Sequence, residues 1–236
     1  IGACSGGQTS TMVFTLPAPQ VQLTDLPIES THNSANPIPT DIATTPTASS
    51  TLSSPLDEVK IPENRTHYEL NLTLNYYTHY GIVEEIITYT NRSAQVLEEL
   101  LLSIPPKNYP WSFTLQSLSD ADGNSITNWR EEGVNLYVPL AQPLQPNQTT
   151  SLRLNFRLDF PTVEGTFGVS GRQTNLVNWY PYIPPYDETE GWTTHPQQVV
   201  NNMVVGEYVV NDVADFDVTL KLTDREELIE VAASAP

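Results

Sequence analysis

An alternation of apolar and polar residues with a period of two constrains the fold of this chain more than any other feature. Tyr68 to Tyr76, Leu152 to Phe160 and Phe216 to Leu222 each place an apolar residue at every second position. Successive side chains of a β-strand point to opposite faces, so this period puts the apolar residues of each stretch on one face of a half-buried strand. The chain is therefore expected to build sheets.

Shorter β-prone runs lie between these stretches, separated by turn sequences such as Asp122-Gly123-Asn124. A run of helix-forming residue types ends in Leu100-Leu101-Leu102-Ser103-Ile104 and two prolines, a pattern typical of a buried strand that prolines terminate. The predicted class is all-β, an antiparallel sandwich or a large twisted sheet, preceded by a disordered Thr/Ser/Pro-rich stalk. The shorter runs cover residues 81–90, 96–104, 111–118, 134–140 and 199–210.

Composition excludes several kinds of partner. The formal net charge of −18 repels phosphate backbones, so no nucleic-acid partner is expected. Hydrophobic residues make up 39% of the chain, but no apolar stretch approaches the roughly 18 residues of a membrane span. The single cysteine leaves no internal disulfide and no cysteine-based zinc knuckle. Packing alone must hold the fold.

The first residues, Ile1-Gly2-Ala3-Cys4, resemble the lipobox at the end of a prokaryotic lipoprotein signal peptide. This resemblance implies an acylated Cys4 and a lipid-anchored protein on the extracellular or periplasmic face of a membrane. The alternative is a buried or free cysteine in a truncated terminus. We expect three parts: a lipobox remnant (1–4), a low-complexity tether or strand-donating segment (5–60) and a β domain (61–236).

The tether is rich in Thr, Ser, Pro and Ala and contains no Lys or Arg before Asp57. Such a segment cannot bury enough apolar surface to offset its ordering entropy. Two β-prone runs within it, Thr11 to Leu16 and Val21 to Leu23, can instead add as strands to the edge of a sheet, in this chain or in a neighbouring subunit.

No catalytic, cofactor-binding or metal-binding residue is predicted in this chain. None of the four histidines has another at the i, i+4 spacing of a helical metal site. The acidic segment from Asp120 to Glu131 copies several positions of a calcium loop but misplaces its glycine, which favours a hairpin turn. The pairs Glu84-Glu85 and Glu98-Glu99 point to opposite strand faces, so solvated acidic faces are expected.

Two further groups are candidate sites. An aromatic, proline-rich loop forms either a packed loop core or a ligand-facing surface for peptide or carbohydrate. Four sequons permit N-glycosylation if the host glycosylates its proteins. The loop residues are Trp179, Tyr180, Tyr182, Tyr186, Asp187 and Trp192, and the sequon asparagines are Asn64, Asn71, Asn91 and Asn147.

A series of motifs from about Pro62 to the C-terminus resembles, in its order, the N-terminal β domain of the M1 (gluzincin) aminopeptidase family. The motifs are Tyr68-Glu69-Leu70-Asn71-Leu72, Ile87-Thr88-Tyr89-Thr90-Asn91, Leu136-Tyr137-Val138-Pro139-Leu140 with Pro143-Leu144-Gln145-Pro146-Asn147, Asn178-Trp179-Tyr180-Pro181 with Tyr186-Asp187, Gly191-Trp192, and Ala214-Asp215-Phe216-Asp217-Val218-Thr219-Leu220. The resemblance implies a twisted β domain that precedes a thermolysin-like catalytic domain and walls one side of its cleft.

The family's zinc motif, His-Glu-x-x-His, does not occur in this sequence. The resemblance therefore implies a non-catalytic domain that shapes a substrate cleft, with zinc held by a catalytic domain outside this chain. Its partners would be a membrane, through the lipid anchor, and a peptide substrate. The alternative is a non-enzymatic extracellular module that binds a ligand or a neighbouring subunit, the latter by N-terminal strand addition.

Overall fold

The computed structural model describes residues 62–194, 211–224 and 230–233, together with the backbone of three short strands at 10–15, 199–200 and 203–204. Within these residues no helix is long and apolar enough to cross a membrane. The elements are β1 (Ser10–Thr15), β2 (Thr66–Asn75), β3 (Tyr80–Thr90), β4 (Leu97–Ser103), the 3-10 helix η1 (Pro105–Asn108), β5 (Phe113–Ser119), β6 (Arg130–Glu132), β7 (Asn135–Leu144), β8 (Thr149–Asp159), β9 (Phe167–Ser170), β10 (Gln173–Leu176), β11 (Tyr186–Asp187), β12 (Gly191–Trp192), β13 (Val199–Val200), β14 (Met203–Val204) and β15 (Ala214–Thr223).

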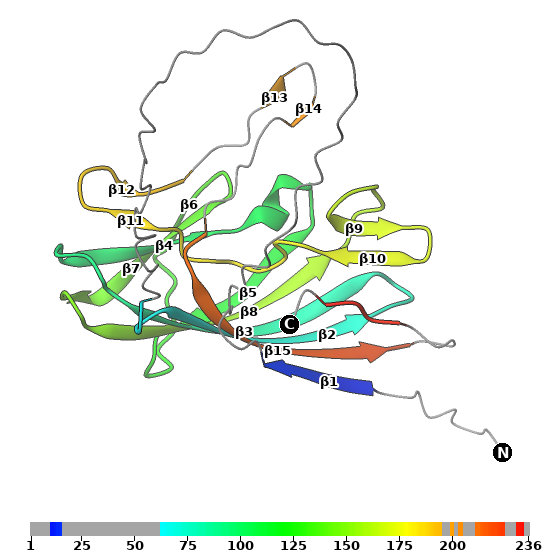
Figure 1. Cartoon of the computed structure of the whole chain (residues 1–236), viewed down its shortest axis with the longest axis horizontal. Helices are drawn as coiled ribbons and strands as arrows, with labels where there is room; N and C mark the ends of the chain where they lie inside the picture. The colour runs from blue at the N-terminus through cyan, green and yellow to red at the C-terminus, as the bar shows by residue number, and fades with distance from the viewer. Residues whose placement is uncertain are drawn as a thin grey trace, which may run out of the picture. The chain divides into compact units, whose positions relative to one another are not determined.

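A six-stranded sheet in the order β1-β15-β2-β3-β8-β5 carries the fold (Figure 1). Adjacent strands in this sheet are antiparallel, with one exception. Strand β15 runs parallel to β2 over ten residue pairs, from Ala214↔Thr66 to Thr223↔Asn75. The predicted all-β class, an antiparallel sandwich or a large twisted sheet, did not specify this parallel pair. A parallel pair requires a long crossover, and here residues 76–213 lie between the two strands.

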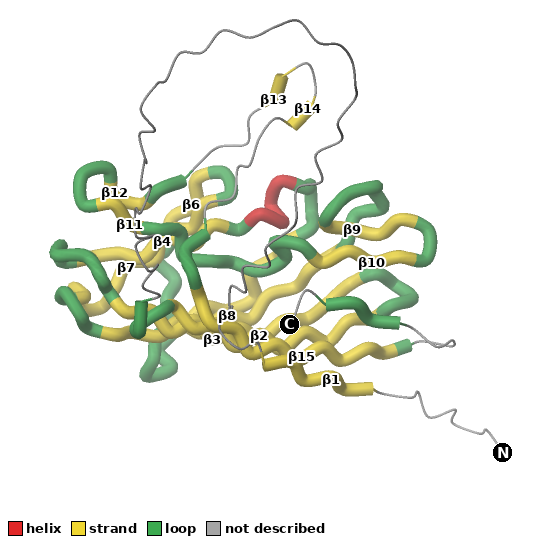
Figure 2. The backbone as a smooth tube through the Cα atoms, in the orientation of Figure 1, coloured by secondary structure: helices red, strands yellow, loops and turns green. Residues whose placement is uncertain are grey.

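A second, smaller sheet has the order β4-β7-β6 (Figure 2). All three residues of the Leu100-Leu101-Leu102 run are buried in β4, so the predicted strand is confirmed. The inner faces of both sheets contribute to one hydrophobic core, in which Phe156 of β8 and Leu136 of β7 are fully buried. Each such side chain stabilises the fold by roughly 1.5–3 kcal/mol, so the all-β class predicted from the period-two pattern rests on this two-layer core.

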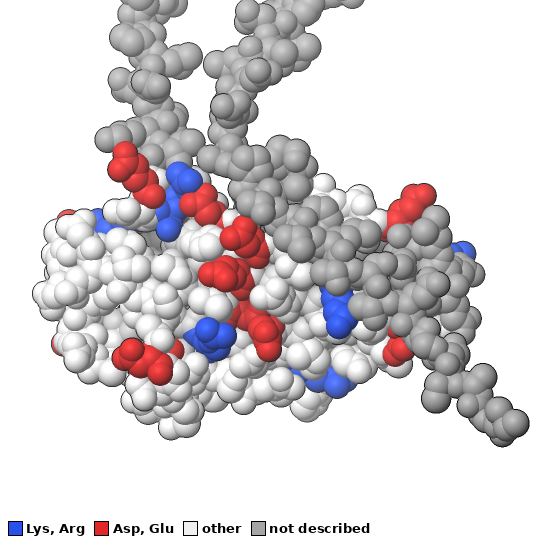
Figure 3. Space-filling model, turned by 90° about the horizontal axis from the view of Figure 1, so that it is seen from below, with Lys and Arg blue, Asp and Glu red and all other residues white. Residues whose placement is uncertain are grey.

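The other face of the large sheet is polar. Arg65, just before β2, contacts Asp215 at 2.7 Å, and His67 contacts Asp217 at 3.0 Å across the parallel pair. Thr88 and Ser151 share a hydrogen bond across β3 and β8. Seen from below, acidic side chains gather near the middle of the molecule with basic ones beside them (Figure 3). One face of this sheet is therefore buried and the other is solvated.

Three predictions need correction. Trp111 lies outside β5, in a left-handed backbone conformation with φ of +67°. The hairpin of β9 and β10 was not predicted. The pair Glu84-Glu85 points to opposite faces, as expected, but Glu85 is completely buried instead of solvated, because the inner face to which period two assigns it is covered by the core.

The predicted calcium-like segment forms a turn. Asp120 accepts hydrogen bonds from the backbone N–H groups of Asp122 and Asn124 and from the side chain of Asn124. These bonds hold the pKa of Asp120 below its ordinary value. Its oxygens thus serve a hairpin connection, as the hairpin interpretation predicted. Cys4, His32 and His195 lie outside the described residues.

Candidate functional site

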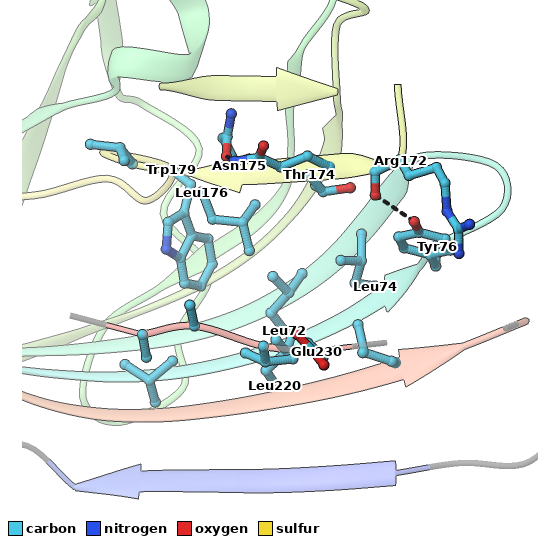
Figure 4. A pocket seen from close by; sticks show the side chains of 17 residues that line it. Leu72, Leu74, Tyr76, Arg172, Thr174, Asn175, Leu176, Trp179, Leu220 and Glu230 are labelled. Atoms are coloured by element: carbon cyan, nitrogen blue, oxygen red, sulfur yellow. Dashed lines mark hydrogen bonds between the residues drawn. The ribbon is translucent and has the colours of Figure 1, made fainter. Parts of the chain in front are cut away.

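An apolar groove of about 840 Å³ lies at one end of the large sheet (Figure 4). Its floor consists of Leu72 and Leu74 from β2 and Val218, Leu220 and Leu222 from β15. The parallel register places Leu72 opposite Leu220 and Leu74 opposite Leu222. Because paired residues share a face and period two repeats along both strands, these five side chains form one continuous apolar surface.

The opposite wall of the apolar groove comes from β10 and the residues after it. Leu176 and Trp179 point toward the floor (Figure 4). At one end the hydroxyl of Tyr76 donates a 2.6 Å hydrogen bond to the backbone oxygen of Arg172, which joins the β2–β3 turn to the β9–β10 hairpin. Residues 230–233 also line the groove. The groove therefore collects segments that lie far apart in the sequence.

The floor of the apolar groove is unevenly covered. Leu72 and Leu74 are 2% and 3% exposed, whereas Val218 and Leu220 of β15 are partly exposed although they pack against the core. The same holds for Phe216. Nine of the ten residues of β15 are neither fully buried nor fully exposed. An apolar strand left partly uncovered in this way is a candidate contact surface.

The first half of the aromatic loop packs into the domain. Tyr180 lies between Tyr68 and Phe216, with ring centroids 5.7 and 5.6 Å away. Trp179 and Tyr182 are buried. Tyr182 exchanges two backbone hydrogen bonds with Ser103, which ties the loop to β4. Of these three loop residues, Trp179 also lines the apolar groove.

The second half of the loop forms a separate small hairpin. Tyr186 in β11 and Trp192 in β12 stack edge to face at 5.0 Å, and Trp192 lies 6.1 Å from Tyr89. Asp187 is exposed and accepts hydrogen bonds from the backbone N–H groups of Thr189 and Glu190, which lower its pKa. The loop residues are therefore divided between two places.

Beside this hairpin lies a smaller cavity of about 200 Å³. Its lining includes Tyr186, Tyr89 and the ion pair between Arg92 and Asp212. Glu188, at its rim, accepts a hydrogen bond from the backbone of Ala94. Burial raises the pKa of Tyr89 to about 12. The charged groups of this cavity already have partners within the chain, and its volume is much smaller than that of the apolar groove.

A buried carboxyl group lies in the core of the large sheet. Glu85 of β3 pairs with Leu70 on one side and Leu154 on the other. Both of its oxygens are buried without a hydrogen-bond partner. Burial raises the pKa of Glu85 well above the ordinary value, and burial also raises the pKa values of nearby Tyr68 and Tyr180. Glu85 lines neither hollow, and a buried carboxyl group without a partner is a cost to stability.

The four sequon asparagines differ in position. Asn64, Asn71 and Asn147 are exposed. Asn91 is completely buried, and its side-chain nitrogen donates hydrogen bonds to the backbone oxygens of Gln95 and Leu144. A glycan on Asn91 would have to displace both bonds.

The part of the groove that sequence reasoning missed is its wall. The signal for the β9–β10 hairpin is the Ser170-Gly171 pair between two short β-prone runs, a recognised turn sequence.

Within the described residues, no three His, Cys, Asp or Glu side chains are grouped so that they could hold a metal ion.

Comparisons with known proteins give a limited result. No protein-family model and no curated protein matches the chain. Among solved structures, it is similar to an M1 zinc metallopeptidase from Deinococcus radiodurans, with 16% identity and a TM-score of 0.40 over 67% of this chain and 32% of that one. A mutant of that enzyme matches with 19% identity and a TM-score of 0.34 over 42% and 21%.

A further match is a two-domain M1 zinc metallopeptidase mutant bound to L-arginine, with 18% identity and a TM-score of 0.34 over 43% and 22% of the two chains. The chain thus spans between about a fifth and a third of these structures. They belong to the family that the sequence motifs resemble. The likeness is partial at these TM-scores, so the function is argued below from the residues themselves.

Proposed function

We propose that this chain is the non-catalytic N-terminal domain of an M1-like zinc metallopeptidase and shapes the substrate cleft of a catalytic domain. The observation that carries the proposal is the partly exposed apolar floor of the groove along β15. Apolar surface of this kind is costly to leave in water, and within one polypeptide a second folded domain is a natural cover for it.

Two features support this role. The motifs that resemble the M1 β domain include β15 itself, from Ala214 to Leu220. Residues 230–233 line the groove, so a domain that followed residue 236 would begin beside the apolar floor. In this proposal the zinc is held and used by ligands of the catalytic domain, while the β domain supplies an apolar wall beside the bound peptide.

The experiment is to read and express the complete gene. The proposal expects a His-Glu-x-x-His motif after residue 236, one zinc ion per protein and aminopeptidase activity, and expects the 236-residue chain alone to cleave no aminoacyl substrate. A stop codon directly after Pro236, or cleavage by the isolated chain, would contradict it.

A matched pair of variants tests the groove itself. Leu220→Glu places a charge on the apolar floor, whereas Thr219→Glu places the same charge on the opposite face of the same strand. In the complete protein, Leu220→Glu should lower kcat/KM at least tenfold and let the β domain unfold separately, and Thr219→Glu should do neither. If Leu220→Glu lowers the Tm of the isolated chain as much as that of the complete protein, Leu220 belongs to the core and not to an interface.

The proposed location is the outer face of a membrane, with acylated Cys4 as anchor. Radiolabelled palmitate should be incorporated into the wild-type protein in its native host and not into Cys4→Ser. Equal labelling of the two proteins would contradict acylation at Cys4.

A second candidate function is assembly by strand addition, which the pairing of β1 with β15 favours. Residues Ser10 to Thr15 pair antiparallel with Leu222 to Asp217 at the edge of the large sheet. An edge strand that accepts one such segment can accept it from a second copy. A Val13→Cys and Thr219→Cys pair, made with Cys4→Ser, tests this: covalent dimers under oxidation indicate exchange between copies, and cross-linked monomers alone exclude it.

A further inference from the structure

Three loops meet at one end of the large sheet. They are the β2–β3 turn (76–79), the segment before β5 (109–112) and the segment after β8 (160–163). The backbone N–H of Phe160 donates to the oxygen of His79 at 2.9 Å, and that of Asp159 donates to the oxygen of Ser112 at 3.0 Å. Because β3, β8 and β5 are adjacent, the loops span two sheet spacings, about 10 Å.

Each of these loops exposes one large hydrophobic side chain. Trp111 is 91% exposed, Tyr77 is 69% exposed and Val163 is 37% exposed. We call these three residues the aromatic tip. Single exposed hydrophobic residues are common on protein surfaces, but these three lie on neighbouring loops at one end of the same sheet.

The backbone around Trp111 holds its side chain outward. The Ser112 N–H donates to the Tyr109 oxygen at 3.2 Å, which closes a turn with Pro110 and Trp111 at its centre. Trp111 has a φ of +67°, the conformation for which glycine is favoured at this position of a turn. On either side, the Tyr109 ring packs 5.5 Å from Phe167 and Ser112 is buried. A bulky residue in a strained, firmly anchored position is an outlier that suggests a function.

Two basic side chains near the aromatic tip are paired with carboxylates of the chain. Arg157 contacts Asp159 at 2.5 Å and lies over the Tyr80 ring at 4.3 Å, and Lys107 pairs with Glu131. Glu164, next to Val163, is exposed and carries a negative charge. A contact made here depends on the aromatic side chains and not on attraction between opposite charges.

The size of the patch argues for a lipid partner. A stable protein–protein interface needs about 800 Å² from each partner, supplied by some 20–30 residues. Three side chains on loop tips fall far short of that area. Trp and Tyr side chains, each with an apolar ring and a polar group, prefer the boundary between lipid headgroups and hydrocarbon.

We propose that the aromatic tip is a membrane contact that inserts Trp111 and Tyr77 into the interface of a zwitterionic bilayer. This inference is independent of the M1-like role and of acylation at Cys4. It concerns residues that belong to neither hollow described above.

The test uses the unmodified 236-residue chain and vesicles of pure phosphatidylcholine. Trp111→Gly removes the side chain in a backbone conformation that suits glycine, so the variant is expected to fold. The matched control is Val96→Ser, which removes a side chain 46% exposed in the β3–β4 connection, at the other end of β3. Folding of all three proteins is checked by circular dichroism.

We expect the wild-type chain to float with the vesicles and its tryptophan emission to shift to the blue. The partition coefficient should fall about tenfold in Trp111→Gly, as expected for losing one buried aromatic side chain, and should not change in Val96→Ser. Replacing a third of the lipid by phosphatidylglycerol should weaken binding. Equal binding of Trp111→Gly and wild type, absence of wild-type binding, or self-association that depends on Trp111 without vesicle binding would each overturn the proposal.

Discussion

Replacing Glu85 by glutamine should stabilise the protein strongly at neutral pH. The Glu85 side chain is completely buried between Leu70 and Leu154, and neither of its oxygens has a hydrogen-bond partner. A charged carboxylate is strongly disfavoured in such a place, so burial raises the pKa of Glu85 well above its ordinary value in the folded protein. Glutamine has nearly the same shape and polarity as the protonated acid but never ionises.

The magnitude follows from the cost of holding the proton. The ordinary pKa of this carboxyl is 4.5, so keeping Glu85 protonated in the folded protein up to pH 7 costs at most about 3.4 kcal/mol relative to the unfolded chain, at about 1.36 kcal/mol per pH unit. Glu85→Gln removes that cost. Burial of an unpartnered polar group, roughly 1–3 kcal/mol, is common to both proteins and cancels.

The sign of the pH dependence is fixed by the raised pKa of the folded state. The unfolded protein loses the proton above pH 4.5 and the folded protein keeps it, so wild-type stability falls as pH rises toward the folded pKa. The variant lacks this loss. The difference in unfolding free energy between Glu85→Gln and wild type should be near zero at pH 4 and grow to about 3 kcal/mol at pH 7.

Urea denaturation followed by tryptophan fluorescence from pH 4 to pH 8 measures this difference directly. The matched control is Glu84→Gln on the exposed face of the same strand, which should change stability by less than about 0.5 kcal/mol. A Glu85→Gln protein that is no more stable than wild type at pH 7, or a difference independent of pH, would show that Glu85 is charged or paired.

Three other substitutions have defined outcomes. Gly168→Ala should lower the unfolding free energy by about 2–4 kcal/mol, because the φ of Gly168 is +133° and a Cβ there would lie 2.5 Å from the Pro161 oxygen. Thermal denaturation measures this loss. The control Gly165→Ala has open space around it and should leave stability unchanged. Asn91→Ala should lower the unfolding free energy by about 2–4 kcal/mol, because it leaves two backbone oxygens without a hydrogen-bond donor. The control is Asn64→Ala, and equal stability of the two variants would refute the prediction. Trp111→Gly should leave stability unchanged or raise it by up to about 1 kcal/mol, since relief of left-handed strain offsets the added chain entropy of glycine; a clear loss in chemical denaturation would show that the side chain packs.

The strands were predictable where local pattern decides them. Period two located β2, β8 and β15 because one face of each strand packs toward the core, and the prolines after Ile104 marked the end of β4. The parallel pairing of β15 with β2 was not predictable, because register between segments about 150 residues apart leaves no trace in local periodicity. Glu85 shows the same limit: the sequence placed Glu84 and Glu85 on opposite faces of one strand, but the burial of Glu85 depended on which strands would cover its face.

The apolar groove was less predictable than the fold. Leucines on alternating positions of β2 and β15 indicate one buried face, and nothing local shows that β15 would remain partly uncovered. The aromatic loop was predicted as one unit, whereas in the structure Trp179 lines the apolar groove and Tyr186 lines the smaller cavity. Which aromatic residues face a hollow depends on tertiary contacts, such as the Tyr182–Ser103 pairing, that composition does not reveal.

Alkylation of one engineered thiol tests the central claim most directly. Leu220→Cys, made with Cys4→Ser, places a thiol on the partly exposed floor of the apolar groove. In the isolated 236-residue chain this thiol should react readily with iodoacetamide, and in the complete gene product it should react at least tenfold more slowly because the catalytic domain covers it. Equal rates in the two proteins would mean that no domain packs against β15.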